Sequence, residues 1–243
     1  MALKIFLDAG HNDKGWDTGA SGFGLREQDV TYSVAKKIKE VLAMYDVEIK
    51  LSRPNKSDNL GSDLNSSLRA RATMANAWGA DLFVSIHCNS VASTRAFGTE
   101  VYTISKESPT NRLALAIGSA ISTKLGTHNR GLKHANFAVL KNTKMPAILV
   151  ELAFISNAND NEKLKNNQDE FARAIASQLI GEYNLEICEA KKEITSANDI
   201  IWELMNGKHK VEILDIQRAV EQLEEAKKQE SSLYWILRKL VNG

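Results

Sequence analysis

Cysteine is scarce in this sequence, which has only Cys88 and Cys188 among its 243 residues. Two cysteines cannot form the disulfide framework of a small secreted domain, and neither stands in the CxxC spacing of a structural zinc site. If the chain binds a metal ion, histidine and carboxylate side chains must therefore supply most of the ligands.

Long apolar runs are also absent. No stretch approaches the ~18–20 uninterrupted apolar residues of a membrane-spanning helix. The amino terminus, MALKIFLDAG, enters a strand-like segment directly and lacks the basic region and long apolar region of a secretory signal. We therefore expect a chain that is made in the cytoplasm without a secretory signal and that has no membrane partner.

A strong charge of either sign is the third missing feature. The chain carries 31 Lys and Arg against 30 Asp and Glu, a formal net charge of +1. Because a nucleic-acid-binding face normally needs an excess of Lys and Arg, this balance argues against a nucleic acid as the main partner. The hydrophobic share of 43% is that of an ordinary globular protein with a sizeable core.

Apolar strand-like segments alternate with amphipathic helices through residue 184. This alternation predicts an α/β fold, with a mostly parallel twisted sheet flanked by helices. The expected strands are 3–8, 47–52, 82–87, 99–103, 137–140 and 147–152, and the expected helices are 30–42, 68–78, 113–125 and 171–179.

The pattern changes after Gly181: residues 186–193 are charged and lack strand character, and from Ser196 onward the segment reads as helix only. We predict a first domain at 1–184, a linker at 185–195 and a small all-helical domain at 196–243. A unit this short has little core of its own, so it is expected to pack on the first domain or to pair with a copy of itself. Apolar residues suited to a homo-oligomer interface are Leu233, Trp235, Ile236 and Leu240.

Three separated strings each place a metal-competent or acid–base side chain at the end of an apolar run: LDAGHN with His11, FVSIHCN with His87 and AILVELAFISN with Glu151. In open α/β sheets, ligands bind at the carboxyl ends of the strands, where these side chains would lie. Two imidazoles and a carboxylate leave a tetrahedral zinc ion one open position for water, and a further carboxylate can act on that water. Together with Glu27, the strings suggest a hydrolytic zinc site.

Each of these residues, taken alone, also has a plainer explanation. His11 lies in the glycine-rich loop AGHNDKGWDTGASGFG, where the alternative is a polar loop residue with no ligand. Glu27 begins a helix, where the helix dipole favours a carboxylate in any case. His87 ends a strand, where a buried histidine needs a partner. Glu151 interrupts an apolar run, so a metal, a raised pKa or a structural ion pair is expected there.

Other polar and aromatic residues are weaker candidates. His128 and His134 flank a loop and are either surface groups or substrate contacts. Cys88 follows His87 directly, so strand alternation should turn it to the opposite, buried face. Trp16, in the glycine-rich loop, is the tryptophan that we consider for ligand contact.

At these residues the sequence resembles the zinc-dependent N-acetylmuramoyl-L-alanine amidases, peptidoglycan hydrolases found among bacterial autolysins and phage endolysins. The resemblance runs from about Lys4 to Tyr183, with its motifs in the family's order: LDAGHN, GASGFGLREQDVT, LRARATMANAWGAD, LFVSIHCNS, GTEVYT and RGLKHANFAVLKNTKMPAILVELAFISNANDNEKL. By position, it assigns the zinc ligands to His11, Glu27 and His87, and the catalytic glutamate to Glu151.

The sequence departs from the family's pattern at two places. Asn12 and Asp13 stand where members commonly have a glycine pair, and Ala153 stands where they have glycine. Neither departure replaces a predicted ligand or base, so they bear on loop geometry and substrate preference.

The resemblance implies a reaction, a cofactor and a partner. The reaction is hydrolysis of the amide that joins the lactyl group of N-acetylmuramic acid to the L-alanine of the stem peptide, with Zn²⁺ as cofactor and peptidoglycan as partner. The missing signal suits an endolysin or an autolysin that reaches the wall after release from the cell. By analogy, the helical tail is expected to target the wall.

Two other classes of protein stay open. One is a zinc peptidase that cuts the peptide cross-links of peptidoglycan. The other is a non-catalytic wall-binding protein that kept the fold. The second predicts a missing base, so the presence of Glu151 counts against it.

Overall fold

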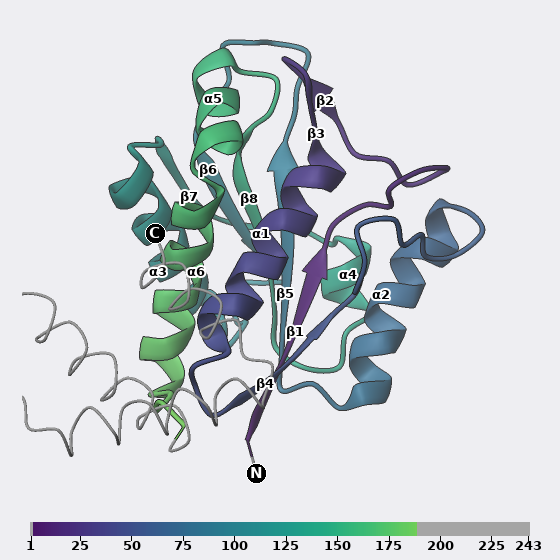
Figure 1. The fold of residues 1–243 in the computed structure, drawn as a ribbon, viewed down its shortest axis with the longest axis vertical. Helices are drawn as coiled ribbons and strands as arrows, with labels where there is room; N and C mark the ends of the chain where they lie inside the picture. Colours follow the sequence, from purple (N-terminus) through teal and green to yellow (C-terminus); the bar gives the residue numbers. More distant parts are fainter. Residues whose placement is uncertain (1, 189–243) are drawn as a thin grey trace, which may run out of the picture. The chain divides into compact units, whose positions relative to one another are not determined.

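The computed structural model describes residues 2–188, which form a six-stranded sheet covered by helices (Figure 1). The strand order is β4-β1-β5-β8-β6-β7, and β6 runs antiparallel to β8 while the other neighbours are parallel. The strands are β1 (Leu3–Ala9), β4 (Val47–Leu51), β5 (Leu82–Asn89), β6 (Thr99–Thr103), β7 (Asn129–His134) and β8 (Ala147–Phe154). The predicted mostly parallel α/β sheet is confirmed.

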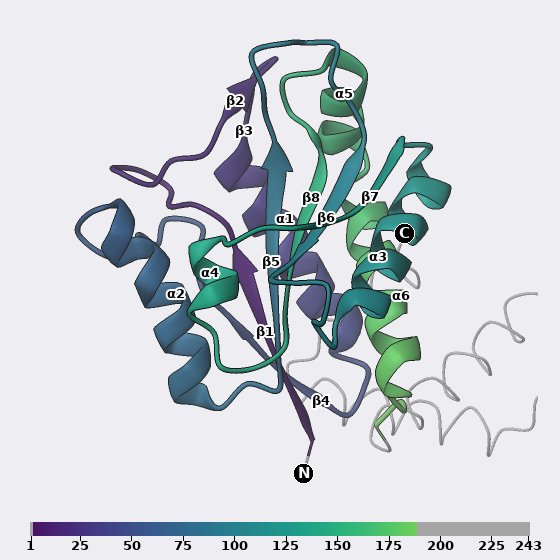
Figure 2. The same ribbon diagram turned by 180° about the vertical axis from the view of Figure 1, so that it is seen from behind.

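Helices cover both faces of the sheet. One face packs against α1 (Glu27–Leu42), α3 (Asn111–Leu125) and α6 (Gln168–Tyr183), and the other against α2 (Leu64–Trp78) and the short α4 (Ala138–Lys141) (Figure 2). The helix α5 (Ala158–Asn166) follows β8, and a small hairpin of β2 (Ser21–Gly22) and β3 (Leu25–Arg26) precedes α1. Two covered faces explain why the central strands are apolar throughout and do not alternate.

Strand alternation divides the core into two layers. Ile5 and Leu7 of β1 belong to the larger cluster beneath α1, α3 and α6. Phe6, between them, belongs to the smaller cluster beneath α2 and α4, where its ring stacks on Phe83 at 5.7 Å between centroids. The smaller layer is the one that carries the polar site described below.

The ends of α2 follow from local sequence. Asp63 is the N-cap of the helix. Its side chain accepts a hydrogen bond from the backbone N–H of Ser66, and the Ser66 hydroxyl oxygen accepts one from the backbone N–H of Asp63. Gly79 ends the helix with φ +68°, a left-handed conformation that glycine adopts without strain. The predicted end of this helix at residue 78 is thus confirmed, although the helix begins four residues before the predicted Leu68.

One predicted strand is wrong. Residues 137–140 were expected to be a strand, but Ala138–Lys141 is the short helix α4, which buries Val139 and Leu140 against the sheet. A short apolar run fits either structure by periodicity alone. The strand that precedes α4 in the chain is β7, which the sequence did not predict. It lies at the sheet edge and its residues are all partly or fully exposed, so it lacks an apolar pattern.

The described fold closes with α6, which ends at Tyr183 and is capped by Asn184 at φ +47°. The chain still pairs beyond it, since the Glu186 carbonyl accepts a hydrogen bond from the backbone N–H of Asp46. The predicted linker, most of which follows residue 188, the helical domain at 196–243 and its oligomer interface lie outside the described residues. The domain boundary at 184 stays a prediction.

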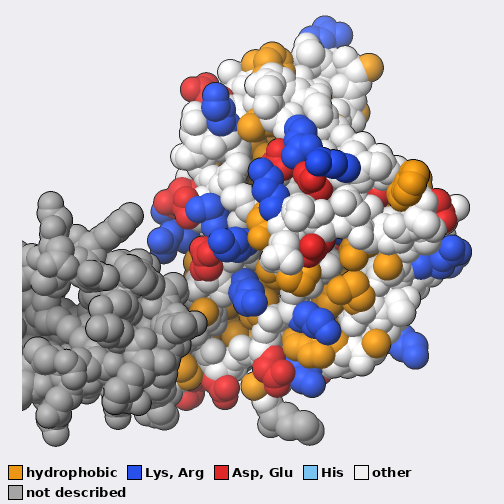
Figure 3. Space-filling model, turned by 45° about the vertical axis from the view of Figure 1, so that its right-hand side comes forward, with side chains coloured by type: hydrophobic (Ala, Val, Ile, Leu, Met, Phe, Trp, Pro, Cys, Tyr) orange, Lys and Arg blue, Asp and Glu red, His pale blue; other side chains and the backbone are white. Residues whose placement is uncertain are grey.

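Two general surface properties bear on partners. No helix within residues 2–188 is long and apolar enough to cross a membrane. On the face shown in Figure 3, Lys and Arg side chains are interspersed with Asp and Glu side chains and do not form one continuous basic surface. This mixture is in keeping with the formal net charge of +1.

Candidate metal and acid–base site

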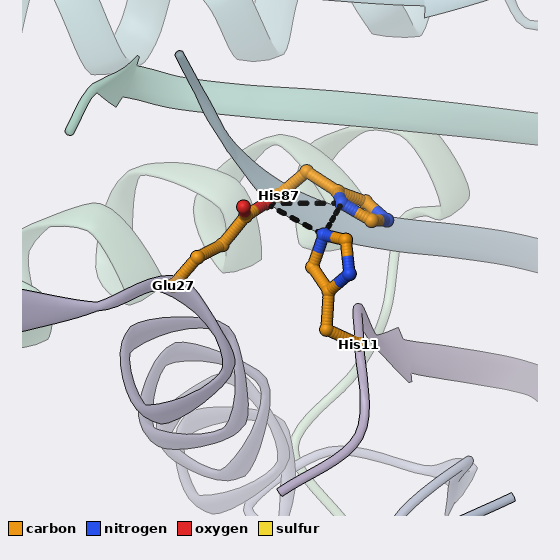
Figure 4. A group of neighbouring side chains, drawn as sticks. All are labelled: His11, Glu27 and His87. Carbon is orange, nitrogen blue, oxygen red and sulfur yellow. Dashed lines mark hydrogen bonds and ion pairs between the residues drawn. The ribbon is translucent and has the colours of Figure 1, made fainter. Parts of the chain in front are cut away.

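Three of the predicted site residues meet at the carboxyl end of the central strands (Figure 4). His11 follows β1, Glu27 is the first residue of α1, and His87 lies on β5. His11 Nε2 lies 3.1 Å from Glu27 Oε1 and 3.2 Å from His87 Nδ1. Glu27 Oε1 and His87 Nδ1 are 3.2 Å apart. Three potential ligand atoms therefore form a nearly equilateral triangle that faces one point and could hold a metal ion.

The His11 ring is held in place from behind. Its backbone has φ +66°, a conformation that is uncommon for a residue with a side chain and that marks a fixed position. Its Nδ1 contacts Asp17 Oδ1 at 3.1 Å, and Asp17 accepts a hydrogen bond of 2.6 Å from the Ser67 hydroxyl. A carboxylate behind a histidine fixes the ring so that its other nitrogen, here Nε2, points to the site.

Glu27 is anchored through both carboxylate oxygens. Oε1 accepts the backbone N–H of Cys88 and Oε2 accepts that of Ala20, each at 2.9 Å. Burial alone would raise the pKa of Glu27, but hydrogen bonds from His11 and His87 hold it well below the usual range. The charge on this carboxylate favours a positive charge between the three side chains.

Glycines let the backbone close tightly over the site. A Cβ at Gly10 would lie 2.4 Å from His87 Cε1, and a Cβ at Gly19 would lie 2.7 Å from the Glu27 side chain and 2.8 Å from the His11 ring. Such contacts are too short for any residue with a side chain. The glycine-rich loop is therefore folded around the site and is not a long open connection.

Glu151 lies on β8 directly beside His87 on β5, because the two residues are partners in the parallel register. Its Oε2 is buried and has no hydrogen-bond partner, and no ion pair to Glu151 is found within the described part of the chain. Burial, followed by the charge of Glu27, raises the pKa of Glu151 to about 8. Of the expected explanations for a buried acid, the raised pKa is thus present and the structural ion pair is not.

A cavity of about 190 Å³ opens at these residues. Its polar lining consists of His11, Asp17, Arg71, His87 and Glu151. Its apolar lining consists of Leu68, Leu149, Phe137, Ala138 and Val139, the last three at the start of α4. The cavity thus offers an unpaired carboxylate and two imidazoles to a ligand that also has an apolar part.

A buried arginine that lines this cavity was not identified from the sequence. Arg71 of α2 is 1% exposed and donates to Asp8 Oδ1 at 2.8 Å, to Asn12 Oδ1 at 3.1 Å and to Asp17 Oδ2 at 3.4 Å. It therefore joins the end of β1 to the carboxylate that orients His11. Its burial could have been predicted from its position three residues after Leu68, which places it on the face of the helix that packs inward.

A second missed group surrounds Glu100, the residue of β6 that pairs with Glu151. Its carboxylate accepts hydrogen bonds from Asn89 Nδ2 (2.8 Å), the Tyr102 hydroxyl (2.7 Å), Lys133 Nζ (2.6 Å) and Arg130 Nε. Burial alone would raise the pKa of Glu100, but the hydrogen bonds from Lys133, Tyr102 and Arg130 lower it. The motif GTEVYT contains two of these residues, Glu100 and Tyr102, so its polar positions could have pointed to this group.

The weaker candidates lie outside the cavity lining. His128 packs beside Phe97, with 5.4 Å between ring centroids, and His134 Nδ1 contacts the Thr103 hydroxyl at 3.0 Å. Trp16 is 62% exposed. Cys88 is buried in the larger core cluster, as strand alternation predicted.

Comparison with known proteins gives one family and several relatives. The family model described as N-acetylmuramoyl-L-alanine amidase matches residues 5–180. The chain is 40% identical over 183 residues to the amidase LytC of Bacillus subtilis, covering 74% of this chain and 35% of LytC. It is 38% identical over 181 residues to the endolysin of Bacillus phage SPP1, covering 72% of this chain and 63% of the endolysin. It thus spans about a third of the first and less than two thirds of the second.

Solved structures show the same fold. The chain is similar to an N-acetylmuramoyl-L-alanine amidase from Clostridium difficile 630, with a TM-score of 0.68 at 30% identity over 75% of this chain and 97% of that one. It is also similar to the catalytic domain of CwlV from Bacillus (Paenibacillus) polymyxa var. colistinus, with a TM-score of 0.67 at 28% identity over 76% and 99% of the two chains.

Proposed function

This chain belongs to the N-acetylmuramoyl-L-alanine amidase family, and from that premise we propose that it hydrolyses the amide between N-acetylmuramic acid and L-alanine in peptidoglycan. The proposal assigns a zinc ion to His11, Glu27 and His87 and the acid–base role to Glu151. The observation that carries it is the triangle of three ligand atoms beside a buried carboxylate oxygen without a partner.

The residues present fit a zinc ion. Zinc takes nitrogen and oxygen ligands at about 2.0–2.1 Å, so two ligands of a tetrahedral ion lie about 3.3–3.4 Å apart. The three separations of 3.1–3.2 Å come within a few tenths of an ångström of that value. Three protein ligands with one open position are typical of catalytic zinc sites, whereas structural sites use four.

Two of the three proposed ligands also have the outer support that such sites need. Asp17 orients His11, and two backbone N–H groups fix Glu27. When bound, zinc supplies Lewis acidity, which makes water a stronger acid and polarises a carbonyl group.

Glu151 is placed to move the proton of the reaction. Its carboxylate lies beside His87 and has a buried oxygen without a hydrogen-bond partner, so it is free to accept a proton from the attacking water. The same proton then passes to the departing nitrogen, so that the C–N bond breaks, the L-alanine amine leaves, and the lactyl group keeps a carboxylate. Leu68 and Val139 belong to the apolar lining of the cavity that contains this carboxylate.

Two alternatives make different predictions. A zinc peptidase would release amino termini from within the cross-links, because it cuts between two amino acids. A non-catalytic wall-binding protein would lack a base, and the position of Glu151 in the cavity disfavours it. We therefore place the amidase reaction first, with the wall as the site of action.

The test is digestion of purified walls followed by identification of the new amino termini. We expect new N-terminal L-alanine and loss of wall turbidity, both abolished by a chelator and restored by zinc. New termini at other stem residues would show a peptidase. Binding to the wall without any new terminus, in zinc-loaded protein, would support the non-catalytic alternative.

A further inference from the structure

The general base of the proposed reaction lies in a row of three side chains across neighbouring strands. His87 on β5, Glu151 on β8 and Glu100 on β6 are successive partners in the sheet register. Paired residues point to the same face of a sheet, so all three face the side covered by α2 and α4. Figure 2 shows this side, with β6 next to β8 and β7 beyond β6 at the sheet edge. Glu100 is therefore the neighbour of Glu151 on the side away from the metal ligands.

Two cations from the edge strand β7 converge on Glu100. Arg130 Nε and Lys133 Nζ both bond to its Oε1, the latter at 2.6 Å. One carboxylate neutralises only one of them, so this cluster of Glu100, Arg130 and Lys133 keeps one surplus positive charge. Glu100 is 2% exposed, and its carboxylate holds both cationic groups one strand away from Glu151.

Both cations have donors to spare and face solvent. The side chains of Arg130 and Lys133 are 33% and 38% exposed. Within the described part of the chain, the other hydrogen bond of the Arg130 guanidinium is one of 3.4 Å to the carbonyl of Phe97. Arg71 also lines the cavity, but it is 1% exposed and its two terminal nitrogens are already paired with Asp8 and Asp17, which leaves only its buried Nε without a partner.

The substrate has anions on one side of the scissile bond only. The acidic group of N-acetylmuramic acid is the lactyl carboxyl, which is tied up in the amide to be cut. Free carboxylates therefore belong to the stem peptide, and the first is the α-carboxylate of the second residue where that residue is D-glutamate. Its carboxyl carbon lies nearly two residues beyond the scissile nitrogen, or about 6 Å in an extended chain. Strands are spaced by about 4.8 Å, so Glu100 stands about one spacing from Glu151 and two from His87.

Building on the amidase function proposed above, we propose that Arg130 and Lys133, held by Glu100, bind the α-carboxylate of the second stem-peptide residue. The cluster then selects stems with free D-glutamate over stems in which this carboxyl is amidated. It also sets the direction of the substrate, with the peptide running from the metal ligands across β8 toward β7 and the sugar on the opposite side.

The test compares two soluble substrates that differ in a single group. They are N-acetylmuramoyl-L-Ala-γ-D-Glu-L-Lys and the same compound with the D-glutamate α-carboxyl amidated, each assayed at low ionic strength with the zinc-loaded full chain. We expect the free acid to have a kcat/KM about tenfold higher, mainly through KM, as is typical of one charge-assisted contact. Lys133→Gln and Arg130→Gln should each bring the ratio of the two substrates toward one. Lys36→Gln, which removes an exposed lysine that pairs with Glu40 on α1, should leave the ratio unchanged.

The ratio is insensitive to the fraction of folded protein, so a partly unfolded variant does not imitate the expected result. An unchanged ratio in both cluster variants, or no preference in the wild type, would overturn the proposal. A third substrate with an amidated C-terminal carboxyl identifies the source of the anion: a preference that follows this group instead also overturns the assignment.

Binding of the intact substrates to Glu151→Gln, measured by calorimetry, separates this proposal from the amidase function. If wild-type protein cuts neither substrate but the variant still binds the free acid about tenfold better, the amidase assignment fails and the carboxylate site stands. Equal binding of the two substrates would overturn the site.

Discussion

Glu151 combines the three properties expected of a general base: a place in the cavity, a carboxylate oxygen without a partner, and a pKa raised to about 8. We predict that Glu151→Gln lowers hydrolysis of soluble muropeptides by about 10²–10⁴-fold, because the amide keeps the shape but cannot accept a proton. Zinc content, measured by elemental analysis, should stay close to that of the wild type. A variant that loses its zinc would instead place Glu151 among the ligands.

The raised pKa of Glu151 also affects the stability of the metal-free protein. Because its pKa of about 8 in the folded state is above the ordinary value of 4.5, folding favours the protonated form. The stabilisation from this group is full below about pH 4.5 and is lost as the pH rises through 8. The glutamine of Glu151→Gln is neutral throughout.

We therefore expect the thermal midpoint of chelator-treated wild type to fall relative to that of Glu151→Gln between pH 5 and pH 9. Both proteins should be scanned at the same ionic strength, so that other titrating groups cancel in the difference. A difference that is constant over this pH range would show that Glu151 keeps an ordinary pKa in the fold.

At this scale the sequence predicted the members of the site but not their supports. His11, Glu27, His87 and Glu151 were all chosen from strand ends and motifs, and the structure brings them to one place. Asp17 and Arg71 were missed, because a carboxylate behind a histidine and an arginine beneath a cavity depend on contacts between distant parts of the chain. No local spacing records such contacts.

At the scale of elements, the loop between β1 and α1 decides whether the three ligands can meet. Gly19 in this loop leaves no room for a side chain, whereas a Cβ at Gly181 in α6 would meet nothing within 4 Å. We predict that Gly19→Ala weakens zinc affinity by an order of magnitude or more, since it displaces Glu27 or His11. Gly181→Ala should leave zinc affinity unchanged and stabilise the fold by about 0.5–1 kcal/mol.

Zinc affinity of both variants is measured by competition with a chromogenic chelator, and the free energy of unfolding by denaturant titration. Equal zinc affinities would mean that the loop can shift without moving the ligands. In that case the close contacts at Gly19 would have no part in shaping the site.

The elements themselves were predictable to different degrees. Central strands such as β1 and β5 are buried on both faces, so their apolar runs identified them. The edge strand β7 could not be predicted in this way, because it is exposed and polar. The apolar residues nearby belong to the short helix α4. This edge contributes Arg130 and Lys133, so a function assigned to the edge could only follow from the structure.

For the whole molecule, the described fold should not depend on the segment that follows it. Within the described residues, the chain pairs with the sheet region as far as Glu186, whose carbonyl accepts the backbone N–H of Asp46. We predict that a chain cut after Cys188 folds, loads zinc and keeps its activity on soluble muropeptides. Its lysis of intact walls should fall if the removed residues serve in targeting.

The control for the truncation is the full chain on the same soluble substrate. If the shortened protein is insoluble, or loses activity on the soluble substrate as well, then residues 189–243 support the enzyme itself. The targeting role proposed for them would then be wrong.

The central claim is that water is added across one particular bond, and labelling the water tests it most directly. Purified walls are digested by the zinc-loaded protein in H₂¹⁸O, and the products are analysed by mass spectrometry. We predict one ¹⁸O atom in the lactyl carboxyl of muramic acid, together with peptides that begin with unlabelled L-alanine. Label in a carboxyl of the stem peptide, with the lactyl amide intact, would contradict the assignment and identify a peptidase.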